Sequence, residues 1–542
     1  MKPLRNITIV AVALAALPLF AQEKVDLQAL HRIRTEALTN SKVMDHLMYL
    51  TDVNGPRLAG SPGYASASEW VMKRLKEYGL EDVKQEKFPF GRGWTYSRFS
   101  AHMLEPSYQP LIGYPVAWTR GTEGVLNVTP MLAVMKTEDD LKKWKGKLKG
   151  AIVFTEAPRD VAMHITALGR RYSDADLLTE QQAPEPGAPA FRMGGPPTPG
   201  APATDFMALR AFRRKLEEFL TEEGVAGLVS SGTRGDGGTV FVQGSRTGRD
   251  MKDKLPITQV VLDAEHYNRI ARLLEKKIPV KLELEVKARF IEDAQDSFNT
   301  FGELKGGRKK DEIVMVGGHL DSWHGGTGAT DNAAGCSVAI EALRILKESG
   351  VKLDRTIRIG LWGGEEQGLL GSRAYVKDHF ADPTKMVVKP EHAKISGYFN
   401  LDNGTGKIRG VYLQGNDMMR PIFESWFAPF KDLGAGAITI RNTGGTDHLS
   451  FDGVGIPGFQ FVQDPMEYET RTHHSNMDVY DAIQKGDMIQ ASAIMASFLY
   501  MTANREEMLP RKPLPKPTPE RRFGEDGPPA GRGPNGTPPT NN

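Results

Sequence analysis

The chain has 542 residues, of which 40% are hydrophobic and 25% charged, a composition typical of a globular protein large enough for two or three domains. Its 69 basic and 67 acidic residues leave a formal net charge of +2, which gives no support for nucleic acid or an anionic membrane surface as a partner. The single cysteine, Cys336, excludes an intramolecular disulfide. Because Cys336 lies just inside a predicted helix, we expect a small buried apolar group rather than a reactive thiol.

Residues 1–21 have the pattern of a secretory signal peptide. Lys2 and Arg5 precede an apolar run over residues 7–20, and Ala21 is followed by polar chain. The apolar run is shorter than the roughly 20 residues that a spanning helix needs, so a membrane anchor is the less favoured interpretation. We therefore expect an exported protein, periplasmic or secreted, with no stable membrane insertion after signal cleavage.

Residues 22–109 are predicted to form the first part of the main domain. A Ser-Pro-Gly run from Ser61 marks a helix start, the apolar spacing of residues 65–78 is helical, and Gly79 follows as a C-cap. The next run, residues 81–90, alternates as a strand does. A helix followed by a strand is compatible with the beginning of an α/β domain.

Residues 110–290 predict a separate domain inserted into the main one. Short β-rich runs separated by turns alternate there with two helical patterns, over residues 206–223 and 264–276. This pattern favours an α+β or β-rich insertion. Within it, residues 181–204 are too rich in proline and glycine to pack, so we expect a flexible surface loop.

Residues 291–505 are predicted to complete the main domain as its catalytic part. Helical segments there, the last over residues 480–504, alternate with four strand-like runs, at residues 311–319, 355–366, 395–402 and 456–463. Such alternation indicates an α/β fold in which a mixed, mostly parallel sheet is sandwiched by helices. Residues 506–542 are rich in proline, glycine and arginine and are expected to be a disordered tail.

Potential metal ligands follow these strands. His319 and Asp321 end an apolar run in an HxD spacing that turns both side chains to one side, and Asp331 follows a glycine-rich loop where the next helix is expected to begin. The other candidates are Glu365, Glu366, Asp402, and either His473 or His474. Since open α/β sheets bind ligands at their strand ends, the set predicts a metal site. Imidazole and carboxylate without thiolate favour zinc, and also suit manganese or cobalt.

Charge balance at the predicted site favours two metal ions. Three ligand carboxylates and a hydroxide neutralise two divalent ions, so such a cluster can be buried without an unpaired charge. Of the adjacent Glu365 and Glu366, one is expected to bind metal while the other acts as general base toward the metal-bound water and then as general acid toward the leaving amine. Asp321 is predicted to hold the second ring nitrogen of His319, and we count it with the catalytic residues.

Further polar side chains are candidates for the pocket around the metals. His448 or Asp447 is a candidate to line it. A free amino or carboxylate group of a substrate would be bound by a carboxylate or an arginine near the metals. For that role the sequence offers Glu467, Arg441 and Arg471 without ranking them.

Five motifs together resemble family 28 of the metallopeptidases: HLDS, TDNAAG, WGGEEQGLLGS, NLD and HHSNMD. That family includes secreted zinc aminopeptidases and carboxypeptidase Q. GGHLDSW, the spacing in GTGATD, HHS and EEMLP at residues 506–510 look most like the carboxypeptidase Q branch. The early NGPRLAGSPG is typical of the family too, and the inserted region resembles a protease-associated domain. The resemblance covers the chain from about residue 40 to 510, and it implies the zinc exopeptidase fold.

Carried over position by position, the resemblance implies a ligand set for two zinc ions. Asp331 would bridge both ions, with His319 and Asp402 completing one site and Glu366 and His474 the other. His474 is preferred over His473 because the family's ligand directly precedes a serine or threonine, as His474 precedes Ser475. Glu365 then becomes the catalytic base.

The expected function is that of a secreted di-zinc exopeptidase. It would cut peptide bonds at a chain terminus or in dipeptides, as an aminopeptidase, through a metal-bound hydroxide and a glutamate base. A carboxypeptidase Q-like dipeptidase or carboxypeptidase is the alternative. A metal-dependent deacylase is disfavoured because the stretch between Asp402 and His474 is too short for that class's dimerisation domain, and a glutaminyl cyclase because of the large insertion. A non-catalytic binding ectodomain would be expected to lack ligands, and none is missing. The expected partner is a peptide substrate, and a homodimer stays open.

Overall fold

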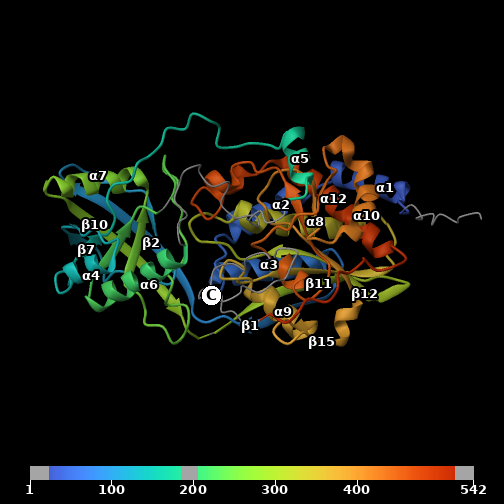
Figure 1. The fold of residues 1–542 in the computed structure, drawn as a ribbon, viewed down its shortest axis with the longest axis horizontal. Helices are drawn as coiled ribbons and strands as arrows, with labels where there is room; N and C mark the ends of the chain where they lie inside the picture. The colour runs from blue at the N-terminus through green and yellow to red at the C-terminus, as the bar shows by residue number, and fades with distance from the viewer. Residues whose placement is uncertain (1–22, 185–205, 233, 294, 519–542) are drawn as a thin grey trace, which may run out of the picture.

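The computed structural model describes residues 23–184, 206–232, 234–293 and 295–518. Within them the chain forms a larger and a smaller lobe (Figure 1). The expected signal peptide, most of the expected proline-rich loop and the end of the expected tail lie outside the described residues. In the part of the chain that is described, no helix has both the length and the apolar character to cross a membrane.

The larger lobe is built on an eight-stranded mixed sheet. Its strands, in spatial order, are β1 (Glu81–Pro89), β11 (Asp296–Leu304), β13 (Arg355–Trp362), β12 (Lys309–His319), β16 (Ile395–Asn400), β19 (Gly458–Gln463), β17 (Ile408–Tyr412) and β18 (Ala437–Thr439). The central strands β13, β12, β16 and β19 are parallel, whereas β11 pairs antiparallel with β13, and β17 with β19. The predicted α/β fold with a mixed, mostly parallel sheet is therefore confirmed.

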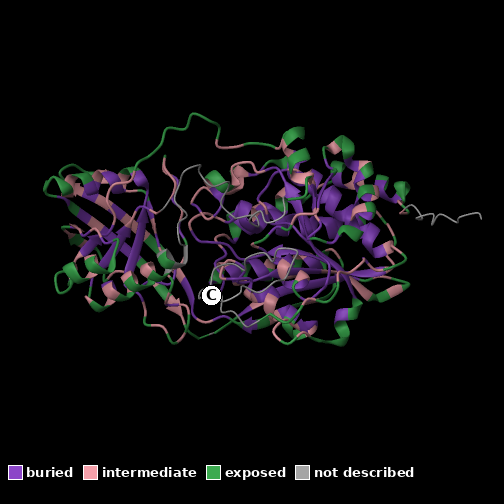
Figure 2. Ribbon diagram, viewed as in Figure 1, coloured by how far each residue is buried: buried purple, intermediate pink, exposed green. Residues whose placement is uncertain are grey.

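Helices cover both faces of this sheet. One apolar core joins one face to α1 (Leu27–Thr39), α2 (Val43–Met48), α3 (Pro62–Glu77), α8 (Ala334–Glu348), α10 (Arg420–Phe427) and α12 (Lys485–Asn504). A second core joins the other face to α9 (Leu370–His379) and α11 (His448–Asp452). Figure 2 shows the buried residues gathered along the strands and the inner faces of the helices. Because both faces are covered, the central strands are apolar along most of their length, as Val314 and Val316 of β12 illustrate.

The smaller lobe contains two sheets. One consists of β3 (Gln109–Pro110), β2 (Gly93–Glu105), β10 (Lys281–Ile291) and β5 (Leu126–Val128). The other consists of β4 (Gly113–Pro115), β9 (Thr258–Leu262), β8 (Gly227–Ser230), β7 (Ile152–Phe154) and β6 (Met131–Leu132). Helices α4 (Glu138–Trp144), α6 (Phe206–Glu222) and α7 (Ala264–Glu275) belong to the same lobe (Figure 1). A core between the two sheets includes Phe154, Val260, Leu282 and Val286.

Several local boundaries differ from the expected ones. The smaller lobe begins with β2 at Gly93 rather than at residue 110, because β2 pairs along its whole length with β10. Residues 506–518, placed in the tail by composition, lie against the larger lobe, where Leu509 is buried. The last helix begins at Lys485, after a short 3₁₀ turn at Tyr480–Ala482.

The helix after the glycine-rich loop also begins later than expected. α8 starts at Ala334, and Asp331 lies in the preceding turn η2 (Ala329–Ala333) with a non-helical backbone. Gly328, in the left-handed conformation at φ +70°, leads into this turn. A Cβ at Gly326 would lie 2.6 Å from the Asp478 oxygen, so the loop needs a glycine there to pass close to that segment. The loop therefore delivers Asp331 to the sheet edge as a turn residue.

Candidate metal centre

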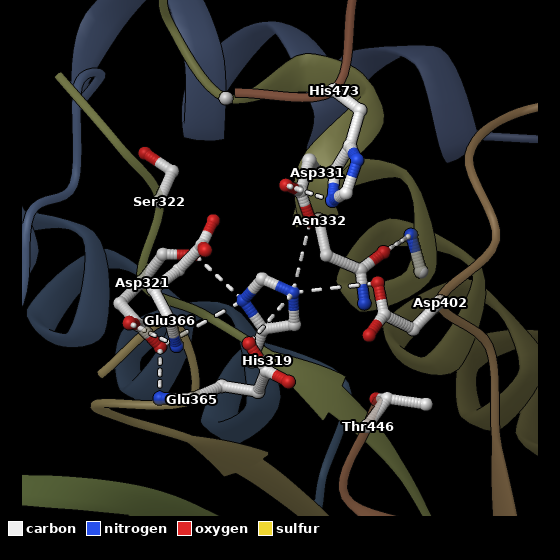
Figure 3. Close-up of polar contacts among 12 residues, drawn as sticks. His319, Asp321, Ser322, Asp331, Asn332, Glu365, Glu366, Asp402, Thr446 and His473 are labelled. Carbon is white, nitrogen blue, oxygen red and sulfur yellow. Dashed lines mark hydrogen bonds and ion pairs between the residues drawn. The ribbon is translucent and has the colours of Figure 1, made fainter. Parts of the chain in front are cut away.

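The carboxyl ends of parallel strands bring the predicted ligands to one edge of the large sheet. β12 ends at His319, β13 is followed by Glu365 and Glu366, and β16 by Asp402. The two adjacent histidines come after β19, behind the turn η6 (Tyr468–Thr472). Figure 3 shows the His319 ring at the centre, with carboxylates on both of its nitrogen sides. The structure therefore brings the strand-end segments together, as the sequence predicts.

His319 is completely buried, and its two ring nitrogens have different surroundings. Nδ1 lies 2.9 Å from the backbone oxygen of Asp321, so Nδ1 is the donor and Nε2 is the nitrogen that faces the carboxylates. Nε2 lies 3.1 Å from Asp331 Oδ1 and 3.3 Å from Asp402 Oδ1. Burial alone would lower the pKa of His319, but Asp402, Glu365 and Asp331 outweigh burial and raise this pKa well above its usual range. Carboxylates that favour a proton on Nε2 would favour a metal ion there as well.

Asp331 extends one oxygen toward each histidine region. Oδ1 faces His319, and Oδ2 lies 3.2 Å from His474 Nε2 and 3.8 Å from His473 Nε2. Burial alone would raise the pKa of Asp331, but the contacts with His319 and His474 hold this pKa well below its usual range. The carboxylate is therefore ionised and placed between two imidazole groups.

His474 makes more contacts with the cluster than His473 does. Besides Asp331, its Nε2 lies 3.0 Å from Glu366 Oε2. The His473 ring instead stacks on Tyr468 at 4.5 Å, and its Nδ1 lies 3.7 Å from a carboxylate oxygen of Glu469. These contacts favour His474 as the ligand.

The ligand atoms form two groups that share Asp331. One group holds His319, Asp331 and Asp402, the other Asp331, His473 and His474, and in each group the ligand atoms lie within 4.8 Å of one another. Asp331 Oδ2 and Asp402 Oδ1 each lie within 3.3 Å of a histidine nitrogen, but neither they nor Glu366 Oε1 accept a well-aligned hydrogen bond among the described residues, and all three are buried. A buried carboxylate oxygen without a partner is costly unless a cation pairs with it. The donor set of imidazoles and carboxylates therefore fits divalent metal ions such as zinc.

Asp321 supports the cluster differently from the prediction. Its carboxylate lies 3.7 Å from His319 Nδ1, while its backbone oxygen accepts the closer contact. The carboxylate instead accepts the backbone N–H groups of Glu365, at 3.2 Å, and Glu366, at 3.4 Å. Burial raises the pKa of Asp321 to about 6, with His319 opposing the shift. One residue thus orients both the histidine and the glutamate pair.

Glu365 lies beside the cluster and, like Glu366, outside both groups of ligand atoms. Its Oε2 is 3.9 Å from His319 Nε2, and the residue is only 9% exposed. Burial raises the pKa of Glu365 well above its usual range, and Asp402, Asp447 and Glu366 add to the shift while His319 opposes it. A buried carboxylate whose pKa is raised can both accept and return a proton near neutral pH.

Asp447 and His448 separate into two environments. Burial raises the pKa of Asp447 to about 7, against the influence of His319 and Ser372, so this carboxyl group shares the electrostatic field of the cluster. His448 contacts Gln414 and the backbone oxygen of Thr443, and burial lowers its pKa to about 4. Of the two, Asp447 is therefore the one coupled to the metal ligands.

The residues proposed to hold a substrate terminus are not equivalent. Arg441 is bonded to the backbone oxygens of Thr179 and Gln182 and pairs with Glu180, so it anchors α5 (Asp174–Gln181) against β18. Arg471 and Glu467 pair with each other at 3.3 Å. Both line a cavity of about 600 Å³ whose wall includes Thr330 and Thr472, the neighbours of Asp331 and His473. These two line the cavity beside the cluster, whereas the guanidinium of Arg441 is engaged with α5.

Two buried residues that the sequence analysis did not single out hold the glycine-rich loop. Arg57 donates hydrogen bonds to the backbone oxygens of Leu50, Leu320, Thr327 and Gly328. Asp478 accepts hydrogen bonds from the backbone N–H and the hydroxyl of Thr330. Burial and the neighbouring Asp331 raise the pKa of Asp478 to about 7. Asp478 stands within the HHSNMD motif and Arg57 within NGPRLAGSPG. The motifs therefore include both residues, but they do not indicate which loop atoms these residues bind.

Comparisons with known proteins match most of the described chain. Residues 299–499 match the sequence model of Peptidase family M28. Carboxypeptidase Q from Bos taurus is 29% identical over 471 residues, which cover 86% of each chain. A crystal structure of a peptidase M28 precursor from Shewanella amazonensis superposes with a TM-score of 0.64 at 25% identity, covering 90% of this chain and 98% of the other. A zinc aminopeptidase from Bacillus subtilis superposes with a TM-score of 0.54 at 20% identity, covering 86% and 98%.

Proposed function

Residues 299–499 belong to peptidase family M28, so the chain is a metallopeptidase, and we propose that it is an exopeptidase that holds two divalent metal ions, zinc in the first place. The expected resemblance to metallopeptidase family 28 is confirmed by this match. The number of metal ions and the type of peptide bond that is cut are proposals that go beyond this family match. The resemblance of the smaller lobe to a protease-associated domain also stays a proposal.

The sharing of Asp331 between two groups of ligand atoms carries the proposal. His319 and Asp402 stand on one side of Asp331, and Glu366 and His474 on the other. With Asp331, these residues supply three carboxylates, which leaves a single further negative charge to balance two divalent ions. A structural zinc site would be closed by four protein ligands, whereas three on each side leave room for water and substrate.

Glu365 moves the proton in the proposed reaction. Divalent metal ions, when bound, supply Lewis acidity that acidifies a coordinated water and polarises the scissile carbonyl. Glu365 accepts the proton of the attacking water and returns it to the leaving amine, because it lies beside the cluster at His319 whereas Glu366 contacts His474. Asp321 fixes the backbone from which Glu365 and Glu366 diverge, so that Glu366 faces His474 while Glu365 stays free.

The charge around the site favours an aminopeptidase. Beyond the ligands and Glu365, buried Asp447 shares the field of the cluster. Arg373 is electrostatically coupled to Asp447 and Glu365, so one arginine faces these two acidic groups, which are not proposed ligands. An excess of carboxylate attracts the α-ammonium group of a peptide and repels a C-terminal carboxylate.

A carboxypeptidase Q-like dipeptidase or carboxypeptidase is the second candidate. It is favoured by the relative from Bos taurus, which matches this chain through both lobes. In that case the paired Arg471 and Glu467, which line the neighbouring cavity, are the groups available to a free carboxylate or a free amine.

A substrate panel decides between these candidates. The purified protein is assayed on amino-acid anilides, free dipeptides and N-blocked dipeptides, each with and without a chelator, and its metal content is determined by mass spectrometry. We expect two ions per chain, hydrolysis of anilides and free dipeptides, and loss of activity with the chelator. Cleavage of free or N-blocked dipeptides without cleavage of anilides would favour the second candidate, and fewer than two ions would contradict the two-ion site.

We also propose export to the periplasm or the medium. This proposal rests on the basic and apolar pattern of residues 1–21. N-terminal sequencing of the protein from cell fractions checks it, with Gln22 expected as the first residue.

A further inference from the structure

The smaller lobe touches the segment that carries His474. Val242 donates its backbone N–H to the His474 oxygen at 3.0 Å, and Asn476 donates its own to the Val240 oxygen at 3.0 Å. Phe241 and Ser475 form an antiparallel bridge between these contacts. The Asn476 side chain also accepts the Val240 N–H at 2.7 Å and donates to the Gly238 oxygen at 3.0 Å. Residues 238–242 thus pair with residues 474–476 like two short strands.

Arg234 of the same lobe holds the other end of the histidine segment. Its guanidinium donates to the backbone oxygens of Glu469 and His473, both at 3.0 Å, and lies over the Phe241 ring at 4.0 Å. Burial lowers the pKa of Arg234, with Glu469 opposing the shift. A half-exposed guanidinium bonded to two carbonyl groups restrains the backbone on either side of the turn.

Gln243 contacts the His474 ring itself. Its side-chain nitrogen lies 2.9 Å from His474 Nδ1, while Nε2 of the same ring faces Asp331 and Glu366. A histidine that binds metal through Nε2 carries its proton on Nδ1 and needs an acceptor there. The oxygen and nitrogen of a glutamine amide exchange places by a half-turn of the side chain, so Gln243 can supply that acceptor from the same position.

We propose that the smaller lobe is a working part of the metal centre, in which residues 234–243 position His474 and Gln243 accepts the proton of its Nδ1. The inference rests on the two-ion function proposed above. It makes Gln243 and Arg234 positioning residues, since Gln243 contacts the Nδ1 side of the His474 ring and Arg234 the backbone oxygen of His473. It also gives the inserted lobe a role at the reaction centre, because the lobe positions His474, which completes the proposed ligands of the second ion.

The release rate of zinc to a chromogenic chelator tests the inference without measuring activity. We expect Gln243→Met to release the more weakly held ion about tenfold faster than wild type, because loss of a group that orients a metal ligand costs ten- to a hundredfold in affinity. Gln243→Glu should release it no faster than wild type, because a carboxylate accepts the Nδ1 proton at all times. Arg234→Met should also release it about tenfold faster, although removing a positive charge by itself would strengthen the binding of a cation.

Arg98→Met is the matched control, because Arg98 lies in the same lobe, on β2, and pairs with Glu285 of β10. Its release rate should equal that of wild type. If Arg234→Met does not fold, as judged by thermal unfolding in chelator, Arg234→Lys replaces it, since a single ammonium cannot span both carbonyl groups.

Release within twofold of wild type for both Gln243→Met and Arg234→Met would overturn the inference. Equal acceleration in Gln243→Met and Gln243→Glu would overturn the acceptor role of Gln243. Binding of fewer than two ions by the wild-type protein would instead contradict the proposed function, so the two failures are distinguishable.

Discussion

Glu365 and Glu366 are adjacent in the chain, yet they have different partners. Glu366 reaches His474 at 3.0 Å, and its second oxygen is buried without a hydrogen-bond partner among the described residues. Neither glutamate belongs to the two groups of ligand atoms, and Glu365 lies 3.9 Å from His319 Nε2. The backbone between them is fixed by Asp321, so the two side chains cannot exchange roles by a small rotation. One glutamate is therefore placed to bind metal and the other to transfer a proton.

Substitution of Glu365 by glutamine should separate metal binding from catalysis. The amide has the shape of the carboxylate but cannot accept the proton of water, so we expect kcat to fall by about 10² to 10⁴. Metal content should stay at the wild-type value, because Glu365 is the proposed base and not one of the proposed ligands. Parallel assays of hydrolysis and of bound metal check this. Glu366→Gln is the control and should lose metal, whereas more than a tenth of wild-type activity in Glu365→Gln would rule out the proposed base.

Arg57 is a buried cation that stabilises a loop through hydrogen bonds to backbone oxygens, not through an ion pair. It is completely buried and donates to carbonyl groups on both sides of the glycine-rich loop. We expect Arg57→Met to lower the free energy of unfolding by about 3 to 5 kcal/mol, because several buried oxygens lose their donor. Urea unfolding of the metal-free protein measures the loss.

The matched control for Arg57 is Arg34, whose partly exposed ion pair with Asp432 contributes at most about 1 kcal/mol. An equal loss in Arg57→Met and Arg34→Met would contradict the role of Arg57. A loss confined to Arg57→Met, together with weaker metal binding, would link the loop to the position of Asp331.

At the scale of elements, α9 and β1 are joined by a histidine between two glutamates. His379 of α9 lies 3.0 Å from Glu86 of β1 and 3.1 Å from Glu391. The hydrogen bond with Glu86 is the main cause that raises the pKa of His379. Burial alone would raise the pKa of Glu86, but His379 and Lys84 lower it to about 2. The contact is therefore strongest where the histidine is charged and both glutamates are ionised.

The stability that this contact adds should depend on pH. A histidine whose pKa is raised by folding contributes its full stabilisation below its unfolded pKa of about 6.5 and loses it as pH rises through the folded value. We expect His379→Gln to cost up to about 1 kcal/mol at pH 6, since the pair is partly exposed, and less at pH 9. Urea unfolding of wild type, His379→Gln, Glu86→Gln and the double variant isolates the pair. A coupling energy that is the same at both pH values would contradict this account.

The parts of the site that could be predicted from sequence are those that follow strands. His319, Glu366 and Asp402 can be predicted as candidate ligands because each stands at or after the end of an apolar run. Parallel strands bring such positions to one edge of the sheet. Asp331 can also be predicted as a candidate ligand, but the sequence pattern places it at a helix start. Its backbone is non-helical, because it depends on contacts of the glycine-rich loop. Arg57 has no pattern of its own, since its partners are backbone oxygens of residues up to 271 positions away.

The same reason explains the fold boundaries. The strand character of β1 and the helix α3 could be predicted, because their signals are local: Ser61 caps α3, and Gly79 follows it in the left-handed conformation. That β2 belongs to the smaller lobe is decided by its pairing with β10, which lies far along the chain. Burial of Leu509 depends likewise on packing against the larger lobe. Local patterns identify elements, and distant partners assign them to a lobe.

At the scale of the whole molecule, the two lobes meet next to the proposed metal ligands. Trp118 of the smaller lobe packs edge to face on Trp323, with ring centres 6.1 Å apart, and Trp323 packs on His474 at the same distance. His324 lies within hydrogen-bond distance of the Pro115 oxygen, at 2.6 Å. Together with the strand-like pairing of residues 238–242, these contacts make the lobe interface continuous with the ligand cluster. Metal binding and lobe contact should therefore be coupled.

Metal removal should accordingly loosen the interface before it loosens the core. A free metal concentration about a thousand times the Kd adds about 4 kcal/mol to the free energy of unfolding. Without metal, the buried carboxylates repel one another. We expect chelation to lower Tm by several degrees and to accelerate hydrogen exchange at the Val242 and Asn476 amides, which bond across the interface.

The amides of α12, a helix buried in the core of the larger lobe, provide the internal reference for this experiment. Hydrogen exchange followed by mass spectrometry on metal-loaded and chelated protein reports both regions at once. If α12 and the interface accelerate equally, metal stabilises the fold as a whole and the coupling is not local. If neither accelerates, the histidine segment keeps its place without metal. Acceleration confined to residues 238–242 and 474–476 would show that the ions hold the lobes together through His474.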